Sequence, residues 1–355
     1  MNDFLLKLKH LLSLYIFRIE ESGLKATPKD ERDFKTSVLG WGEYKPKHSY
    51  HLIPTLSVKH QLFNTCSFNS ATVQKEIDEG VVLEPRSIIA WAVKNNLVSG
   101  DGFADLRAAQ KAMQEYGITQ IDIAPRGEGM PWPGYSNLDL ARFKLQAAEH
   151  KTKSFWFVDN RNDILKLLDE NNILDTGLLW FSGFNQGGGF KEPWIITKSL
   201  GWSIGGHAII IKGYIYDFVG VDKDYRIIQG KNGIDVYVHQ NSYGKDWGGK
   251  ILDDNGILHK GLFFSAMDYF DKNDIYGTIA NLDIDKLDAK LINSNDVIIK
   301  KKTDSALYLA CGTVLVPFST WESFEPDFGV FKIIELDDSQ FAKYIISKNS
   351  IIRSV

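Results

Sequence analysis

Cysteine is nearly absent from this sequence. Only Cys66 and Cys311 occur among the 355 residues, so the chain can form at most one disulfide, and a zinc site built from pairs of cysteines is excluded. A chain with so few cysteines is typical of a reducing compartment. We therefore expect a cytoplasmic protein that uses neither a disulfide framework nor a metal or other cofactor.

Long apolar runs and a concentration of charge of one sign are also missing. No apolar run approaches the roughly 20 residues that a membrane-spanning helix needs. The short run from Leu11 to Phe17 is followed by charged residues without a small-residue cleavage pattern, so we find no convincing signal peptide. The formal net charge is −4, and lysines and arginines are scattered along the chain. This argues against nucleic acid as a partner, because phosphate binding needs a focused basic surface.

The first 32 residues carry a helical pattern. Apolar side chains recur there at helical spacing, at Leu5, Leu8, Leu12, Tyr15, Ile16 and Ile19. Gly23 would end this helix, and the polar stretch from Ala26 to Asp33 is predicted to be a linker. Such an amphipathic helix could pack on its own protein, dock onto an assembly partner or touch a membrane, and the first of these interpretations is the plainest.

Helix-forming segments precede strand-forming segments in the rest of the chain. Helices are predicted at 67–79, 87–96, 104–116 and 164–171, and strands at 177–181, 207–215, 225–228 and 236–239. This order predicts an α+β domain with two segregated lobes, which we assign to residues 33–282. An aspartate-rich change near Asp283 then introduces strand-like pieces at 297–299, 306–310, 314–316 and 331–335. We expect residues 283–355 to form a small β-rich accessory module, with Cys311 as an ordinary core residue.

Three residues carry the candidate chemistry, and each has an ordinary structural explanation when taken alone. Cys66 comes just before a predicted helix, where the helix dipole stabilises a thiolate, although a lone cysteine is usually a small buried apolar residue. His207 opens an apolar strand after two glycines, a place that can face a cleft but often holds a structural histidine. Asn241 follows a strand, where asparagine most often serves a turn.

Together these residues resemble one family. The order Gln61, Cys66, His207 and Asn241 is similar to that of the papain-like cysteine peptidases, in which a glutamine precedes the cysteine, the histidine opens a strand, and Asn-Ser-Trp-Gly follows the next strand. About 140 residues separate the cysteine from the histidine, within the roughly 130–150 expected of that family. The matching flanks are Gly206-His207-Ala208, Asn241-Ser242-Tyr243-Gly244 and Trp247-Gly248, with weaker matches at Asp101 to Leu106 and Ser265 to Phe270.

The resemblance implies a fold and a role for each residue. The fold would have a helical lobe and a β-barrel-like lobe. Cys66 would attack the scissile carbonyl as a thiolate paired with His207, which would later protonate the leaving amine, and Asn241 would orient the ring. Gln61 would share an oxyanion hole with the backbone N–H of Cys66. The substrate-binding residues would be Gly100, Asp101, Gly102, Gly206 and Trp247, and Trp247 would also shield the His207–Asn241 hydrogen bond from water.

Some features depart from the family pattern. Ser67 stands where a tryptophan usually follows the cysteine, Tyr243 replaces the tryptophan of Asn-Ser-Trp-Gly, and one residue fewer than usual separates Gln61 from Cys66. The usual inhibitory propeptide pattern is not evident in residues 1 to 40. The disulfide cysteines of secreted members are also missing. These features indicate the bacterial or phage-type branch, with virion association if the chain is phage-encoded.

The sequence leaves two functional hypotheses. The first is a cysteine-type peptidase that hydrolyses peptide or protein substrates, and the same triad could also cut an isopeptide or a cell-wall cross-link. The second is a structural protein of a virion or surface assembly, with a papain-like fold and little or no activity, that contacts its partner through the N-terminal helix or the C-terminal module. The presence of all four site residues favours the peptidase.

Overall fold

The computed structural model describes residues 24–28, 35–39, 41, 43–61, 64–98, 103–120, 138–185, 195–199, 203–273, 276–281, 297–303, 306–311, 314–317, 332–341 and 345–346. The expected N-terminal helix, the expected groove residues Gly100, Asp101 and Gly102, and the Cys311 side chain lie outside the described residues.

Helices and strands are interspersed in the described part of the chain up to Asn185, and mostly strands follow. The helices are η1 (Thr36–Leu39), α2 (Cys66–Glu79), α3 (Arg86–Lys94), α4 (Leu106–Glu115), α5 (Leu140–Ala148), α6 (Arg161–Asp169), α7 (Ser182–Asn185), α8 (Met267–Asn273) and α11 (Asp338–Phe341). The strands up to residue 281 are β1 (Tyr50–Leu52), β2 (Leu83–Glu84), β3 (Thr119–Gln120), β4 (Phe155–Phe157), β5 (Leu174–Phe181), β6 (Ile195–Ile196), β7 (Ser203–Val221), β8 (Ile227–Gln229), β9 (Ile234–Gln240), β10 (Gly249–Leu252), β11 (Leu258–Ala266) and β12 (Thr278–Asn281).

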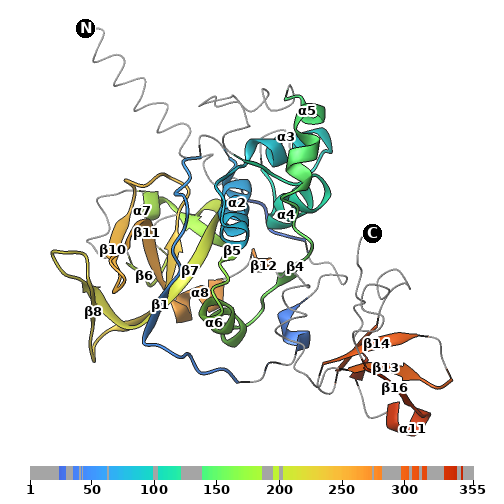
Figure 1. Cartoon of the computed structure of the whole chain (residues 1–355). Helices are drawn as coiled ribbons and strands as arrows, with labels where there is room; N and C mark the ends of the chain where they lie inside the picture. The colour runs from blue at the N-terminus through green and yellow to red at the C-terminus, as the bar shows by residue number, and fades with distance from the viewer. Residues whose placement is uncertain are drawn as a thin grey trace.

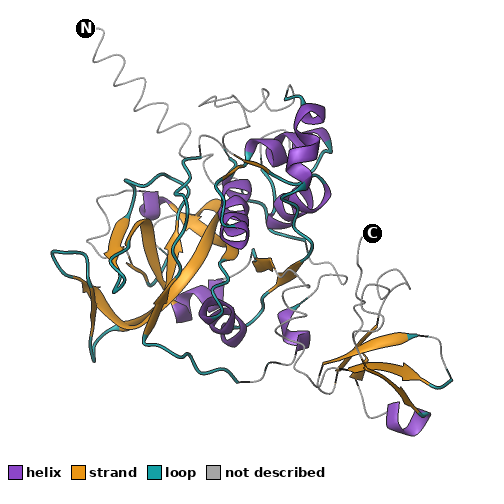
Figure 2. Ribbon diagram, viewed as in Figure 1, coloured by secondary structure: helices purple, strands orange, loops and turns teal. Residues whose placement is uncertain are grey.

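One large sheet organises these elements. Its ten strands follow the order β10-β11-β9-β7-β5-β12-β4, while β1 and β8 pair with β7 and β6 pairs with β11. The long strand β7 lies between β5 and β9, antiparallel to both. Helices α2, α3, α4 and α5 gather on one side of the sheet, and α6 and α8 lie at another (Figures 1 and 2). Helix α2 packs against β7 and β5.

A second sheet is formed by the C-terminal strands. It contains β13 (Val297–Lys301), β14 (Leu307–Cys311), β15 (Val314–Pro317), β16 (Lys332–Leu336) and β17 (Ile345–Ile346) in the order β16-β13-β14-β15-β17. No strand of the described residues before 282 pairs with it. The four predicted strand pieces of this region are confirmed, and its assignment to a separate module stays a prediction.

The predicted helices of the first half are confirmed with small shifts of their ends. The helix after Cys66 ends at Gly80, whose φ of 72° is a left-handed conformation that favours glycine, and its N–H bonds to the carbonyl of Glu76. Helix α4 likewise precedes Gly117, with φ 92°. Helix α5 and strands β10 and β11 were not predicted, because their apolar residues do not follow one clear period.

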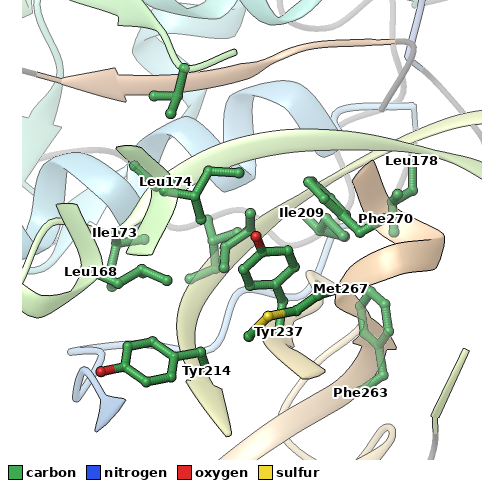
Figure 3. Close-up of a cluster of buried hydrophobic side chains, with 14 of the residues drawn as sticks. Leu168, Ile173, Leu174, Leu178, Ile209, Tyr214, Tyr237, Phe263, Met267 and Phe270 are labelled. Carbon is green, nitrogen blue, oxygen red and sulfur yellow. The ribbon is translucent and has the colours of Figure 1, made fainter. Parts of the chain in front are cut away.

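The main hydrophobic core lies beneath the large sheet. Figure 3 shows side chains from α6, β5, β7, β9, β11 and α8 converging on one cluster, with Leu168, Ile173, Leu174, Leu178, Ile209, Tyr214, Tyr237, Phe263, Met267 and Phe270 labelled. In the described part of the chain, no helix is both long enough and apolar enough to cross a bilayer.

Helix α2 is buried along most of its length although many of its residues are polar. The Gln74 amide nitrogen donates to the carbonyls of Ile173 and Ile279, both at 2.8 Å. The carboxylate of Glu76, whose side chain is 0% exposed, accepts from Lys59 Nζ at 2.5 Å, from Ser57 Oγ at 2.7 Å and from the N–H of Leu83 at 2.9 Å. A polar group that is buried must be hydrogen-bonded, so these contacts fix where α2 can lie.

The Lys59–Glu76 pair gives a test of this anchoring. Replacement of Lys59 by methionine leaves the buried Glu76 carboxylate without its counter-charge, and we expect the free energy of unfolding to fall by about 3 kcal/mol. Urea unfolding followed by circular dichroism measures this difference. The control is Lys111→Met, at an exposed position on α4. Equal stabilities of the two variants would show that the buried pair does not anchor the helix.

Candidate active site

Cys66 is the first residue of the buried helix α2. Its side chain is 0% exposed and carries a reduced thiol. The carbonyl of Thr65 accepts hydrogen bonds from the N–H groups of Phe68 and Asn69, so the helix begins at the cysteine. The positive end of the helix dipole lies at this terminus and favours a negative charge on the sulfur.

His207 lies on β7 and reaches the same region as Cys66. Cys66 and Ala208, which follows the histidine, belong to one buried cluster. Gly206 precedes the histidine, and a Cβ at this glycine would lie 2.4 Å from Cζ of Tyr276 and 2.7 Å from the carbonyl oxygen of Leu24. The glycine is therefore required by close neighbours on this side of β7. The structure thus brings together the helix start and the strand that carry the predicted cysteine and histidine.

Asn241 fixes the protonation of the histidine ring. Its Oδ1 accepts a hydrogen bond from the backbone N–H of Ser242 at 2.7 Å and lies 2.8 Å from Nε2 of His207. A backbone N–H can only donate, so this atom of Asn241 is the amide oxygen and Nε2 of the neutral ring carries the proton. The lone pair is then on Nδ1, which has no hydrogen-bond partner among the described residues.

Aromatic side chains enclose the ring. Tyr243 stacks on it at 4.8 Å between centroids with 29° between the planes, and Trp180 lies 4.7 Å away at 58°. Trp247 packs edge-on against Tyr243 at 5.5 Å. The sequence assigned the shielding of the His207–Asn241 hydrogen bond to Trp247. In the structure the residue stacked directly on the histidine ring is Tyr243. Trp180 also packs on this ring, and the sequence did not identify it as a residue of the site.

Burial of this kind shifts the protonation equilibrium of His207. The ring is 0% exposed. Burial lowers its pKa from 6.5 to about 4, and the hydrogen bond to Asn241 opposes the shift only in part. The buried ring is therefore neutral at neutral pH, and Nδ1 is available as a proton acceptor.

Gln61 is held beside the asparagine loop. Its N–H donates to the carbonyl of Ser242 at 2.7 Å, and the hydroxyl of Ser242 donates to its Oε1. His60 and Tyr243 form an antiparallel bridge, and the N–H of Gly244 bonds to the carbonyl of Lys59 at 2.9 Å. The segment before Cys66 and the segment after Asn241 are therefore joined. Because the amide oxygen Oε1 of Gln61 accepts from Ser242, its amide nitrogen Nε2 lies on the opposite side of the planar amide group from Ser242.

The described arrangement supplies a thiol, a base and an amide donor but no metal site. No group of three possible metal-ligating side chains is found in the described part of the chain. Of the expected substrate-binding residues, Gly206 and Trp247 lie at this site, whereas Gly100, Asp101 and Gly102 lie outside the described residues. The chemistry available is nucleophilic attack by sulfur, with proton transfer through a histidine held in one tautomer.

Comparison with known proteins bears on the fold. No model of a known protein family matches the chain, and no curated protein matches it. Among solved structures, xylellain, a cysteine protease from Xylella fastidiosa, aligns with a TM-score of 0.52 at 16% identity over 74% of this chain and 97% of that protein. Digestive procathepsin L 3 of the Tenebrio molitor larval midgut aligns with a TM-score of 0.50 at 15% identity, over 76% and 78% of the two chains.

A third structure gives the same result. ProCathepsin B S9 from Trypanosoma congolense aligns with a TM-score of 0.50 at 11% identity, over 75% of this chain and 87% of that protein. At such identities the likeness concerns the fold. The chain has the mixed helix-and-sheet fold of papain-like cysteine proteases.

The tautomer of His207 can be measured directly. We expect nitrogen-15 NMR to show a proton on Nε2 and none on Nδ1, with the ring still neutral at about pH 5 because its pKa lies near 4. The folded-state pKa is below the ordinary 6.5, so the unfolded chain binds the proton first, and stability is lost as the pH falls from about 6.5 to 4. Replacement of Asn241 by alanine should mix the two tautomers. A protonated ring at pH 6 in the intact protein would contradict this assignment.

Proposed function

We propose that this protein is a papain-like cysteine peptidase that hydrolyses peptide bonds through Cys66, His207 and Asn241, with Gln61 in the oxyanion hole. The observation that carries the proposal is the hydrogen-bond chain from Ser242 to Asn241 to His207, which leaves the Nδ1 lone pair of a buried histidine for proton transfer. The fold of the chain and the place of Cys66 at a helix start support it.

The reaction follows from the acceptor atom on His207. Nδ1 takes the proton of the Cys66 thiol, and the sulfur attacks the carbonyl carbon of the substrate. The N–H of Cys66 and Nε2 of Gln61 stabilise the negative charge that develops on the carbonyl oxygen. The same His207 proton passes to the leaving amine as the C–N bond breaks, and a thioester with Cys66 remains.

Hydrolysis of the thioester returns the site to its starting state. Nδ1 of His207 accepts a proton from water while the water oxygen attacks the thioester carbonyl carbon, and the protonated ring then returns its proton to the leaving sulfur. Asn241 keeps the ring in one orientation through both steps. The stacked Tyr243 and Trp180 exclude water from the His207–Asn241 hydrogen bond, which strengthens it.

The substrates are peptides or proteins, and the same chemistry applies to an isopeptide or a cell-wall cross-link. We also propose that the protein belongs to the bacterial or phage-type branch, with a cytoplasmic or virion-associated location. The small number of cysteines supports this assignment. The competing interpretation as an inactive structural protein is decided by the reactivity of Cys66.

The first test is covalent labelling by a broad epoxide inhibitor of cysteine peptidases. On long incubation we expect one label per chain at Cys66, located by mass spectrometry of the cysteine-containing peptides. In His207→Ala the labelling rate should fall by about 100-fold because the base is lost. The control is His51→Ala, since His51 lies on β1 and contacts Asn171 and Tyr214, away from the site. Labelling that does not depend on His207 would favour the structural protein.

The second test concerns Gln61. Replacement of Gln61 by alanine removes one donor to the developing oxyanion, and we expect kcat to fall by about 100-fold with little change in KM. Ser242→Ala removes only the hydrogen bond that orients the Gln61 amide and should cause a smaller loss of kcat. The measurement is the hydrolysis rate of a protein substrate such as casein. Unchanged kcat in Gln61→Ala would remove this residue from the oxyanion hole.

A further inference from the structure

Strand β7 carries a second buried basic residue beyond the candidate base. Lys212 follows His207 along this strand, and its side chain is 0% exposed. Its Nζ lies 3.0 Å from Nδ1 of His259 and donates to Oγ1 of Thr55 at 3.3 Å. A lysine is almost never fully buried unless it has specific partners. The reaction proposed above does not use this amine, so its contacts need an explanation of their own.

The partners of His259 decide how its ring is protonated. Nε2 lies 3.1 Å from Oδ2 of Asp253, whose Oδ1 accepts from the N–H groups of Ile257 and Asn255 at 2.8 and 3.0 Å. Burial raises the pKa of Asp253, but the hydrogen bonds from Ile257 and His259 outweigh it and leave the pKa below its usual range. An ionised carboxylate only accepts, so Nε2 carries the ring proton and the lone pair of Nδ1 faces Lys212.

The amine of Lys212 fits this place in its uncharged form. Within the described part of the chain Nζ has two acceptors, on His259 and Thr55, and a neutral amine has two hydrogens to donate. A third proton would add a buried charge without a third acceptor. Burial lowers the pKa of Lys212 from 10.5 to about 7, and the attraction of Asp253 opposes this only in part. Burial also lowers the pKa of His259 to about 4, so its ring is neutral as well.

The contacts of the amine continue from Thr55 into the segment that precedes helix α2. Oγ1 of Thr55 donates to Oε1 of Gln240 at 2.7 Å, and Nε2 of Gln240 donates to the carbonyl of Ser57 at 2.9 Å. The N–H of Ile53 donates to the backbone carbonyl of Lys212 at 2.8 Å. The lysine on β7 and the glutamine at the end of β9 therefore hold this segment from below.

The segment ends at the proposed oxyanion donor, and we call residues 53–61 the Gln61 segment. The N–H of Gln61 bonds to the carbonyl of Ser242, and Gln240 directly precedes Asn241 in the sequence. The side chains that line the outer surface of the segment are those of Pro54, Leu56 and His60, of which Pro54, Leu56 and His60 are all exposed. The position of Gln61 relative to Asn241 thus depends on contacts made beneath the segment.

Other titratable groups lie around this segment but are engaged elsewhere. Lys59 pairs with Glu76 at 2.5 Å. Nε2 of His239, on β9, lies 2.7 Å from Oγ of Ser265, and burial lowers the pKa of this histidine to about 3. His60 is exposed. The charge of the buried amine is therefore set by its burial and by the carboxylate behind the imidazole.

We infer that Lys212 is a positioning residue for the proposed reaction: its uncharged amine holds the Gln61 segment on the sheet, and a proton on the amine weakens this hold. The inference rests on the proposed function, in which Gln61 stabilises the oxyanion. Lys212 acts only through Thr55 and Gln240 and does not touch the reacting atoms. A charged amine is costly to bury, and departure of the segment would let it reach water.

The charge state is tested by the pH dependence of unfolding in urea. The folded-state pKa of Lys212 is below 10.5, so the stability from this group is present above pH 10.5 and is lost as the pH falls from 10.5 to 7. From pH 7.5 to 9.5 the unfolding constant of the wild type should fall about 50-fold relative to that of Lys212→Met. The control Lys223→Met, at an exposed position, should keep a constant ratio to the wild type. A constant ratio for Lys212→Met would overturn the inference.

Hydrogen exchange at the Gln61 amide measures the hold on the segment without using activity. At pH 8, Lys212→Met removes the donor to Thr55, and Thr55→Val breaks the same connection while it leaves the lysine in place. Both variants should increase the exchange rate of the Gln61 N–H about tenfold, while Lys223→Met should exchange at the wild-type rate. Thermal melting checks that each variant is folded. Folded Lys212→Met and Thr55→Val proteins that exchange like the wild type would overturn the hold.

Kinetics separate this inference from the proposed function. Lys212→Met should lower kcat for casein about tenfold with KM unchanged, and in the Gln61→Ala background it should have no further effect, because the lysine acts through Gln61. An equal loss of kcat in both backgrounds would overturn the positioning role. If the wild type cuts no casein while the exchange results hold, the proposed function fails and the hold on the segment stands. If Lys212→Met cuts casein as fast as the wild type, the proposed function stands and the positioning role fails.

Discussion

The structure depends on the burial of helix α2. A helix that carries Asn69, Ser70, Thr72, Gln74 and Glu76 among its buried residues is stable in the interior only where these side chains find hydrogen-bond partners. The carbonyls of Ile173 and Ile279 meet this requirement for Gln74, and the Lys59 ammonium meets it for Glu76. Because these contacts hold the helix, they also set the position of its first residue, the candidate nucleophile Cys66.

The second half of the site is positioned by bonds of fixed direction. The N–H of Ser242 decides which atom of Asn241 is the acceptor, and this in turn decides which nitrogen of His207 carries the proton. The same Ser242 holds Gln61 through its carbonyl and its hydroxyl. Ser242, the residue that follows Asn241, therefore contacts both the asparagine that orients the base and the proposed oxyanion donor. The rings of Tyr243 and Trp180 pack against His207 and exclude water from this hydrogen-bond chain.

Sequence patterns were sufficient for the parts of the site that depend on local order. The helix after Cys66, its end at Gly80 and the strand before Asn241 follow from capping and periodicity. The strand that carries His207 was also predicted, but it begins at Ser203 and not at the histidine. The enclosure of His207 could not be found in this way, since Trp180 reaches the ring through the register of β5 against β7. Leu24 was equally hidden. It adjoins a polar stretch that looks like a linker, and only the tertiary structure shows that it is buried beside Cys66.

The glycines beside His207 allow residue 24 to approach the sheet. A Cβ at Gly177 would lie 2.3 Å from Cδ2 of Leu24, and one at Gly206 would lie 2.7 Å from its carbonyl oxygen. With no side chain at either position, the N–H of Leu24 donates to the carbonyl of Gly206 at 3.0 Å, and the leucine side chain joins the buried cluster that contains Cys66. A side chain at either glycine would therefore displace this short strand from β7 and open the cluster around the candidate nucleophile.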